Sequence, residues 1–535
     1  MGKRRKQAAA VEAVPVPADQ PAPRRRGRRM YEGAMISRLT SDWVTSGSSV
    51  DAEIWGSLRT LRNRTRQLAR DNDYAAQALR TISGNVVGQG IPFQAQVAMQ
   101  RGNRLDKATN DRIEKAWKAW CRADSCHVAG KLNFNDIERL LIRSVAESGE
   151  VLVRLVKQPF GRNNKIPLGL EVLEADWLDD RMSGRTAENG NEIRMGVEVD
   201  RWSRPVAYWF LPKHPGDYLV SSTQQASSGR SVRVPAKDVI HLFRTDRPGQ
   251  TRGVSWLASC IKRLHHLAGF EEAEVVRARA AASLMGFIQS PEGELAGDDV
   301  MDNERVQDFQ PGVFRYLNPG ETVNIPNLNT PDPQFEAFMR AMLRGMSAGL
   351  GISYSSISAD MSQSNYSSSR LSLLEERDNW RSLQGWMIES FHQRIFNEWL
   401  DLAVLVGALN LPLYESKPEL YRNVRWMPRG WGWVDPTKEV EAYKEAVRCG
   451  FTTLTQVIAE QGNDIDEVLL GLANEREQAQ ELGLTLDIDP GKVNANGATQ
   501  AKPQGAIVPD DPYASTDATA LADAAAADPA AGGQA

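Results

Sequence analysis

The sequence contains few of the features that mark secreted or membrane-spanning proteins. Its 535 residues hold only four cysteines, which lie far apart at Cys121, Cys126, Cys260 and Cys449. So few thiols exclude a disulfide framework and are typical of a reducing compartment. No window reaches 18 apolar residues, and the longest apolar run, 402–413, is short and interrupted. We therefore expect a soluble intracellular protein in which this run is a buried segment rather than a membrane span.

Motifs for phosphate binding and nucleophilic catalysis are also scarce. The chain has no G-x-x-x-x-G-K-[ST] P-loop and no G-x-G-x-x-G turn after a strand. Residues 345–349, GMSAG, fit the G-x-S-x-G pattern of a hydrolase, but that motif needs a strand before it and a helix after it. Here a helical pattern precedes the motif, which favours the glycine-rich end of a helix. A serine hydrolase or maturation protease using Ser347 remains an alternative.

Potential metal ligands do not reach a complete set. Cys121, Cys126 and His127 lack a second pair of ligands at the spacing of a zinc site. The pair His265 and His266 lies in a helical pattern, and the acidic pairs Asp179–Asp180 and Glu271–Glu272 are typical of solvated surfaces. We therefore expect no metal, no cofactor and no catalytic residue.

Charge is concentrated at the two ends of the chain. The first 30 residues carry nine Lys and Arg against two acidic residues, about +7, whereas the last 50 carry seven Asp against two Lys, about −5. Both ends are rich in Ala, Pro and Gly and poor in large apolar residues, so we expect residues 1–37 and 484–535 to be disordered. The basic tail could bind nucleic acid electrostatically, which leaves a nucleic-acid-binding adaptor as a second alternative.

Between the tails, the first half of the chain predicts an α+β region. Apolar spacing of 3.6 residues predicts helices over 55–85 and 105–122, and Asn133 or Asn135 can cap a third. Five β-rich runs follow, at 149–157, 168–178, 192–200, 205–211 and 238–244, with an Asn-Gly hairpin loop at 184–192.

The second half is mostly helical. A helix without proline begins near 254, and a proline-broken segment with short β runs covers 289–333. Further helices are predicted over 334–348 and 368–404, and another starts at Pro436 after the cap Asp435 and ends at Gly450. We expect the Trp-rich stretch 426–433 to pack in the core rather than to form a stacking platform.

A polar stretch separates two of these helices. From Ser353 to Ser372, ten of the twenty residues are serine, and only Asp360 and Arg370 are charged. We call residues 351–372 the Ser-rich segment. Hydroxyl and amide side chains make hydrogen bonds that water replaces at little net cost, so such a surface binds weakly and exchanges quickly.

Five stretches of this sequence resemble the lambda-like portal proteins of tailed bacteriophages. The most specific are RPGQTRGVSWL at 247–257 and GLGISYSSIS…SQSNYSSSRLSLLEERDNW at 349–380. The other three are ARDNDYAAQALRTISGNVVGQGI at 69–91, ESGEVLVRL at 147–155 and the WVDPTKEVEAYKEAV…GFTTL block at 433–454. The resemblance covers about residues 40 to 480 and leaves out both tails.

The resemblance implies an α+β portal fold divided into named parts. These are a basic tail (1–37), a wing (38–250), a stem helix (251–285), a clip (286–333), a second stem helix (334–350), a tunnel loop and helix (351–404), a return to the wing (405–435), a helical crown (436–483) and an acidic tail (484–535).

The resemblance also implies a function without catalysis. A portal is a ring, usually of twelve copies, at one vertex of the capsid, and double-stranded DNA passes through it independently of sequence. Its expected partners are the large terminase, the major capsid and scaffolding proteins and the head-completion proteins, with no membrane. The protein is expected in the virion and, during assembly, in the host cytoplasm.

The residues expected to face DNA are Ser355, Ser356, Ser358, Ser362, Gln363, Ser364, Asn365, Ser367, Ser368 and Arg370. Those expected to dock terminase and connector proteins in the clip are Glu292, Glu294, Asp298, Asp299, Asp302 and Glu304.

Overall fold

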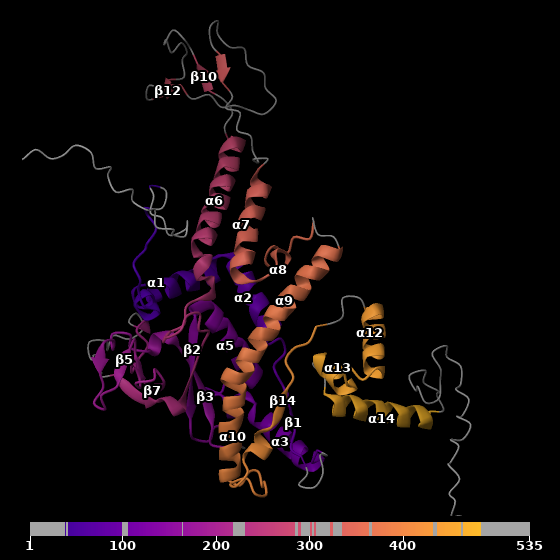
Figure 1. Cartoon of the computed structure of the whole chain (residues 1–535). Helices are drawn as coiled ribbons and strands as arrows, with labels where there is room; N and C mark the ends of the chain where they lie inside the picture. Colours follow the sequence, from indigo (N-terminus) through magenta and orange to yellow (C-terminus); the bar gives the residue numbers. More distant parts are fainter. Residues whose placement is uncertain are drawn as a thin grey trace, which may run out of the picture. The chain divides into compact units, whose positions relative to one another are not determined.

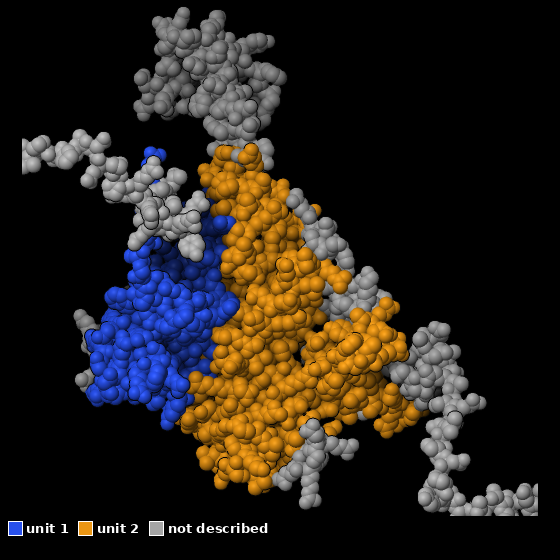
Figure 2. All heavy atoms as spheres, viewed as in Figure 1, with its two compact units in different colours: residues 1–72, 144–152, 173–269 blue, residues 73–143, 153–172, 270–535 orange. Residues whose placement is uncertain are grey.

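The computed structural model forms two compact units, shown in blue and orange in Figure 2. Unit 1 consists of residues 1–72, 144–152 and 173–269, and unit 2 of residues 73–143, 153–172 and 270–535. The structure describes residues 38, 41–98, 105–162, 164–217, 231–283, 287–289, 300–301, 304–305, 322–324, 334–362, 366–431, 436–461 and 464–482. Both tails predicted to be disordered lie outside the described residues.

Unit 1 contains the first long helix, α1 (Val50–Asp71) (Figure 1). The Ser49 hydroxyl caps it by accepting the Ala52 N–H at 3.2 Å. The predicted single helix over 55–85 is wrong, because Asn72 has an extended backbone that ends α1 before α2 begins. Helix α2 (Asp73–Val86) belongs to unit 2.

An antiparallel sheet of five strands forms the other part of unit 1, in the order β4-β5-β6-β7-β8. Its strands are β4 (Arg185–Thr186), β5 (Glu192–Arg194), β6 (Val197–Val199), β7 (Pro205–Phe210) and β8 (Val232–Pro235). The predicted run 192–200 is a hairpin rather than one strand, since Met195 and Gly196 both have positive φ and form a two-residue turn. The Asn-Gly loop predicted at 184–192 is confirmed as the connection from β4 to β5.

Three more strands form a second sheet in the order β3-β2-β9. They are β2 (Glu150–Val156), β3 (Gly169–Glu174) and β9 (Val239–Phe243), and all three were predicted as β-rich runs. The apolar core of unit 1 combines residues from both sheets: Leu152, Leu173, Leu178, Val197, Val199, Tyr208, Phe210, Val234 and Val239.

Unit 2 is built around aromatic side chains. The Trp117 ring on α3 (Lys107–Trp120) lies 5.1 Å from Trp399 and 5.2 Å from Phe134, measured between centroids. Phe134 opens α5 (Phe134–Ser148), and Asn133 caps it as predicted, its Oδ1 accepting the Asp136 N–H at 2.9 Å. Strand β1 (Phe93–Ala95) pairs with β14 (Val424–Trp426), so Trp426 joins this core, as expected for the Trp-rich stretch.

The long helices of the second half largely match their predictions. Helix α6 (Ile261–Ser283) is shorter than the predicted 251–285, because Ser255 caps a separate 3-10 turn, Trp256–Ser259, before it. Helix α7 (Phe335–Leu350) agrees with its prediction, and its Phe338 ring lies 4.5 Å from Phe270 of α6. A continuous helix then covers α9 (Tyr366–Met387), a π-helical turn (Ile388–His392) and α10 (Gln393–Leu405).

Between α6 and α7 the described backbone forms two short antiparallel pairs. Strand β10 (Phe287–Gln289) pairs with β13 (Thr322–Asn324), and β11 (Val300–Met301) pairs with β12 (Glu304–Arg305). These strands agree with the short β runs predicted there.

The C-terminal helices of unit 2 are α12 (Pro436–Arg448), α13 (Leu454–Glu460) and α14 (Ile465–Glu481). Pro436 is the first residue of α12, as predicted, and Gly450 follows its end with a φ of 76°. Unit 2 also contains the small helices α4 (Ala123–Cys126) and α11 (Glu419–Arg422). Among the described residues, no helix combines the length and apolar character needed to cross a membrane. The α+β fold class is confirmed.

Candidate functional site

The Ser-rich segment lies between α7 and α9 in unit 2 and begins with a glycine. Gly351 has a left-handed backbone with a φ of 66°, and its N–H bonds the Ser347 carbonyl, so it ends α7. A side chain at this φ would be strained, which explains the glycine.

The segment is not a continuous loop. Residues Tyr354–Ser358 form a short helix, α8, for which the Ser353 hydroxyl accepts the Ser356 N–H at 3.2 Å. Ala359 ends it with a left-handed φ of 55°. The expectation of a loop is therefore wrong for residues 354–358. The Ser353 side chain caps this helix. Capping depends on where a serine stands relative to a helix, and the serine content of the stretch does not show that position.

The serine hydroxyls within the described part of the segment bond to nearby groups. Ser355 lies 3.2 Å from the Ser353 hydroxyl, and Ser358 donates to the Tyr354 carbonyl at 2.8 Å. Ser356 differs, since its hydroxyl donates to Glu376 of α9 at 3.0 Å. Ser362 is exposed, and its N–H donates to Asp360.

Two charged residues frame this polar surface. Hydrogen bonds from Ser362 and then from Tyr354 lower the pKa of Asp360 to about 2, so its carboxylate is ionised at neutral pH. Arg370 lies half-buried on α9, one turn after its start. Charge within the described segment is thus limited to one anion and one cation, as the sequence indicates.

Several predicted site residues fall outside what the structure describes. Gln363, Ser364 and Asn365 lie outside the described residues, and Ser367 and Ser368 are described only as backbone in the first turn of α9. In the predicted clip, Glu304 is described only as backbone in β12. The other five clip residues, Glu292, Glu294, Asp298, Asp299 and Asp302, lie outside the described residues.

Ser347 is not placed as a hydrolase nucleophile. It lies inside α7 with 8% of its surface exposed, and its hydroxyl donates to the Leu343 carbonyl at 3.0 Å. A nucleophile elbow places its serine at a sharp turn after a strand, and here the serine is bonded to its own helix. The geometry contradicts this alternative.

The thiols near α4 lie in a buried environment. Burial raises the pKa of Cys126 to about 12 and that of Cys121 well above its ordinary value. The Cys126 thiol donates to the Cys121 and Leu132 carbonyls at 3.4 Å and 3.7 Å. The Nδ1 atom of His127 accepts the Lys131 N–H at 3.1 Å.

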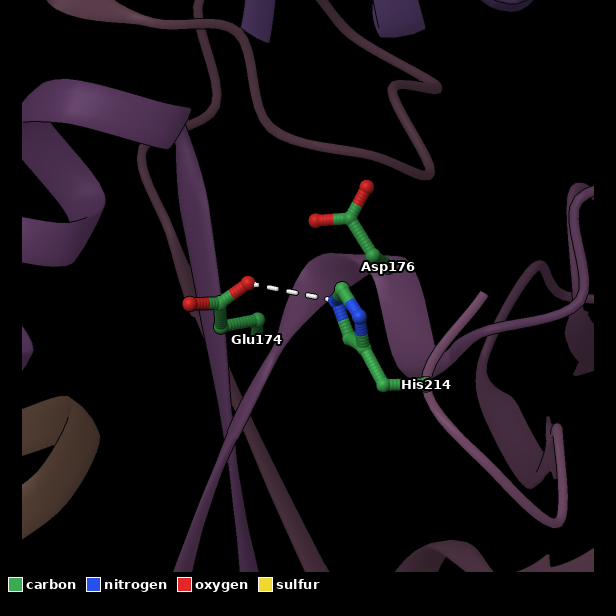
Figure 3. Close-up of side chains that lie close together, drawn as sticks. All are labelled: Glu174, Asp176 and His214. Atoms are coloured by element: carbon green, nitrogen blue, oxygen red, sulfur yellow. Dashed lines mark ion pairs between the residues drawn. The ribbon is translucent and has the colours of Figure 1, made fainter. Parts of the chain in front are cut away.

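One group with metal-ligand chemistry was not anticipated from the sequence. Figure 3 shows Glu174, Asp176 and His214, whose ligand atoms lie within 4.8 Å of one another. The Arg66 guanidinium already binds both carboxylates, at 3.1 Å and 2.7 Å. In addition, His214 Nδ1 accepts the Gly216 N–H, so its Nε2 carries the proton that faces Glu174. These contacts form an ion-pair cluster, in which Asp176 Oδ2 and His214 Nε2 are buried without a hydrogen-bond partner among the described residues.

A buried charge network in unit 1 explains the most specific stretch of the sequence, 247–257. Arg252 is 1% exposed and binds Glu150, itself 0% exposed, with an N–O distance of 2.6 Å. Arg62 binds Glu150 at 2.8 Å, and His241 Nε2 lies 2.9 Å from it. Arg252 also donates to the Met195 and Ala175 carbonyls. One arginine therefore joins four separate parts of unit 1.

Two glycines next to this network permit a close approach of backbone. A Cβ on Gly253 would lie 2.2 Å from the Gly149 carbonyl oxygen, and one on Gly149 would lie 2.4 Å from the carbonyl carbon of Val254. Both positions therefore require glycine. The sequence marks these residues only as part of a resemblance, because the four members of the network, Arg62, Glu150, His241 and Arg252, are up to 190 positions apart.

The ion pairs of the network determine the protonation of its members. Burial alone would raise the pKa of Glu150, but the charge of Arg252 and the hydrogen bond from His241 outweigh it and hold the pKa well below its usual range. Burial lowers the pKa of His241. The network thus favours a carboxylate anion at Glu150 and a neutral imidazole at His241.

Comparison with known proteins identifies relatives along most of the chain. The family described as phage portal protein, lambda family, matches residues 37–384. A probable portal protein of Halomonas phage phiHAP-1 is 28% identical over 484 residues, covering 89% of this chain and 91% of the relative. Portal protein B of Escherichia phage lambda is 22% identical over 481 residues, covering 83% and 88%.

Solved structures give weaker likenesses. The neck of an empty gene transfer agent particle matches with a TM-score of 0.45 and 15% identity, covering 76% of this chain and 94% of that chain. The virion of the native gene transfer agent matches with a TM-score of 0.42, 13% identity, and coverage of 76% and 94%. The family match alone covers well over half of the sequence, from before α1 to within α9. This chain belongs to the lambda family of phage portal proteins, whose general role is to form a DNA channel.

Proposed function

We propose that this chain assembles with copies of itself as a twelve-membered ring at one vertex of the capsid, where double-stranded DNA enters and leaves. The observation that carries the proposal is the family match over 37–384, which includes the start of the long helix after the Ser-rich segment. The role is structural, and energy for DNA movement would come from a separate terminase. The protein would reside in the virion and be assembled in the host cytoplasm.

The parts of the chain support distinct roles in such a ring. Residues 38–250 with 405–435 would form the wing, α6 and α7 the stem, and 286–333 the clip. Residues 351–404 would form the tunnel loop and helix, and 436–483 the crown. The clip would bind the large terminase and later the head-completion proteins through six of its acidic residues, Glu292, Glu294, Asp298, Asp299, Asp302 and Glu304, while the outer surface would meet major capsid and scaffolding proteins.

The low charge of the Ser-rich segment supports its role as the part that faces DNA. DNA attracts Lys and Arg strongly, so a channel lined with cations would resist sliding. Hydroxyls such as those of Ser355, Ser358 and Ser362 offer weak contacts that exchange with water. Arg370 is the residue of the described segment that can make a charge-assisted contact to a phosphate.

Negative-stain microscopy of the purified protein tests the ring. We expect a ring of about a dozen copies with a central hole. A protein that stays monomeric at all concentrations would contradict the proposal. Deleting residues 1–37 adds a test of the adaptor alternative, because that alternative requires the basic tail whereas the ring does not.

A packaging assay tests the role of the segment. We expect Arg370→Ala, and separately Ser355→Ala with Ser358→Ala, to change the rate or the length of packaged DNA while rings still form. The matched control is Arg181→Ala, since Arg181 is an exposed arginine in the proposed wing, outside the tunnel loop and helix. Wild-type packaging by both segment variants would show that the segment does not act on DNA.

A further inference from the structure

Helix α9 shows an inverted pattern of burial over its first turns. Glu376 is only 6% exposed, whereas Leu371 and Leu374 of the same helix are 62% and 42% exposed. Charged side chains are rarely buried to this degree unless they are paired. The inversion indicates that Glu376 has a specific partner on the inner side of the helix.

That partner belongs to the Ser-rich segment. The Ser356 hydroxyl donates to Glu376 Oε2 at 3.0 Å, and the Ser353 hydroxyl in turn donates to Ser356 at 2.7 Å. Glu376 Oε1 is buried and has no hydrogen-bond partner within the described part of the chain. A chain of two hydroxyls therefore ends on one buried carboxylate.

Other attachments of α8 are weaker. The side chains of Gln77 and Thr81, both on α2, lie 3.4 Å and 3.5 Å from the Ser356 carbonyl, at the outer limit of hydrogen bonding. Ile357 is the apolar anchor, with 2% of its surface exposed. The helix has only five residues, too few to be stable by itself.

Both ends of α8 allow the backbone to change direction. Gly351 and Ala359 each have a left-handed conformation, and for Ala359 that conformation is strained. The short helix thus lies between two bends. Asn379 of α9 donates to the Gly351 carbonyl at 3.1 Å, at the first bend, and the contact from Ser356 to Glu376 is the polar attachment of α8 itself to α9.

We propose that Glu376 is a positioning residue that holds helix α8 of the Ser-rich segment docked through Ser356, and that loss of this one hydrogen bond releases α8. A hydrogen bond to a charged group changes an equilibrium about 10- to 150-fold. Without Ser356, the buried carboxylate would lose its donor, and the docked state would carry the full cost of its desolvation. The role of the released segment in DNA passage rests on the proposed function, whereas the docking itself does not.

Hydrogen exchange of the peptide 352–362 in the full-length protein, without DNA, measures docking directly. We expect Ser356→Ala to accelerate exchange about tenfold or more. Alanine is the better helix former, so helix propensity predicts the opposite direction. Adding Glu376→Gln to Ser356→Ala should restore slow exchange, because a neutral amide costs less to bury than a carboxylate.

Ser355→Ala is the matched control, since the Ser355 hydroxyl lies on α8 and contacts the Ser353 hydroxyl at 3.2 Å; the exchange of this variant should stay within about twofold of wild type. Equal exchange in Ser356→Ala and Ser355→Ala would overturn the proposal. So would a double variant that exchanges as fast as Ser356→Ala. Packaging by Ser356→Ala is measured separately: fast exchange with unchanged packaging would leave the docking role in place and count against the role of the segment in DNA passage.

Discussion

Among single residues, Arg252 and Glu150 carry charges that water cannot solvate, since their side chains are 1% and 0% exposed. Two charges in a protein interior are stable only when both are present and well bonded. Arg252 meets this condition with hydrogen bonds to Glu150 and to two carbonyls of unit 1. Its neighbourhood also contains the two glycines that let the backbones of residues 149 and 253 meet.

We predict that Arg252→Ala lowers the free energy of unfolding by about 3–5 kcal/mol, because it leaves Glu150 buried with too few partners. Equilibrium urea unfolding followed by tryptophan fluorescence measures this change. The control is Arg247→Ala, whose partner Glu53 is solvent-exposed, and its unfolding midpoint should not move. Equal shifts in the two variants would show that the network does not stabilise unit 1.

Acidification should weaken the same network through His241. Burial lowers the pKa of His241 in the folded chain, so below about pH 6.5 the unfolded chain binds a proton that the folded chain does not. The contribution of His241 to the free energy of unfolding is therefore fully present above pH 6.5 and decreases as the pH falls below it. The pKa of Glu150 is also lowered in the folded chain, from an ordinary value of 4.5. The free energy of unfolding therefore decreases further as the pH falls below about 4.5.

We predict that His241→Gln removes the part of this loss between pH 6.5 and 5, because glutamine can still donate to Glu150 but does not titrate. The loss below about pH 4.5 should remain. Melting temperatures of both proteins across pH 4–8 test this. Parallel curves for wild type and variant down to pH 5 would rule out His241 as the titrating group.

At the scale of elements, local patterns were predicted well and long-range contacts were not. The 3.6-residue spacing located α3, α7 and α9, and β-rich runs located β2, β3 and β7. The pairing of β1 with β14 was missed because it joins residues more than 300 positions apart in runs of three. The break at Asn72 was missed because apolar periodicity continues across it from α1 to α2.

The candidate site was also predicted only in part. The sequence predicted the low charge of the Ser-rich segment, because charge depends on residue types alone. The helix α8 and the contact from Ser356 to Glu376 depend on where two helices meet, which one sequence does not contain. The buried network around Glu150 was likewise invisible, since its arginines and histidine look like surface residues in the sequence.

The packing of α3 on β1 contains a carboxyl group with an unusual environment. Glu114 of α3 accepts the Ala95 N–H at 2.7 Å, and burial raises its pKa to about 7, with Asp464, Asp111 and Asp466 nearby contributing in the same direction. The folded chain therefore binds the proton more tightly than the unfolded chain. Stability from this group is present below the unfolded pKa near 4.5 and is lost as the pH rises through 7.

We predict that Glu114→Gln raises the melting temperature at pH 8 and leaves it unchanged at pH 5, because glutamine resembles the protonated acid and still accepts from Ala95. Asp111→Asn, at an exposed position of the same helix, is the control and should have a smaller effect. A shift of equal size at both pH values would mean that Glu114 does not titrate between them.

At the scale of the whole molecule, the proposed ring has two classes of contact. One class stabilises the fold of each subunit, and the other binds partner proteins. The aromatic core and the Glu150 network lie within single units, so changes there should act on folding. The proposed clip presents acidic residues in a segment with only short strand pairs among its described residues. Changes of charge there should act on partners and leave the ring intact.

We predict that neutralising the clip acids lowers binding of the large terminase several-fold without loss of rings. The variant changes Glu to Gln and Asp to Asn at Glu292, Glu294, Asp298, Asp299, Asp302 and Glu304. Attraction between exposed charges is screened by salt, so the difference from wild type should shrink as ionic strength rises. Terminase binding to purified rings at two salt concentrations measures both effects.

A control with the same change in net charge distinguishes the clip from the overall charge of the ring. It replaces six exposed acids outside the clip in the same way: Asp71, Glu188, Glu415, Glu419, Glu441 and Glu475. If both variants lose terminase equally, the attraction comes from net charge and the clip has no special role. If only the clip variant loses it, and loses it less at high salt, terminase recognises the acidic residues between α6 and α7.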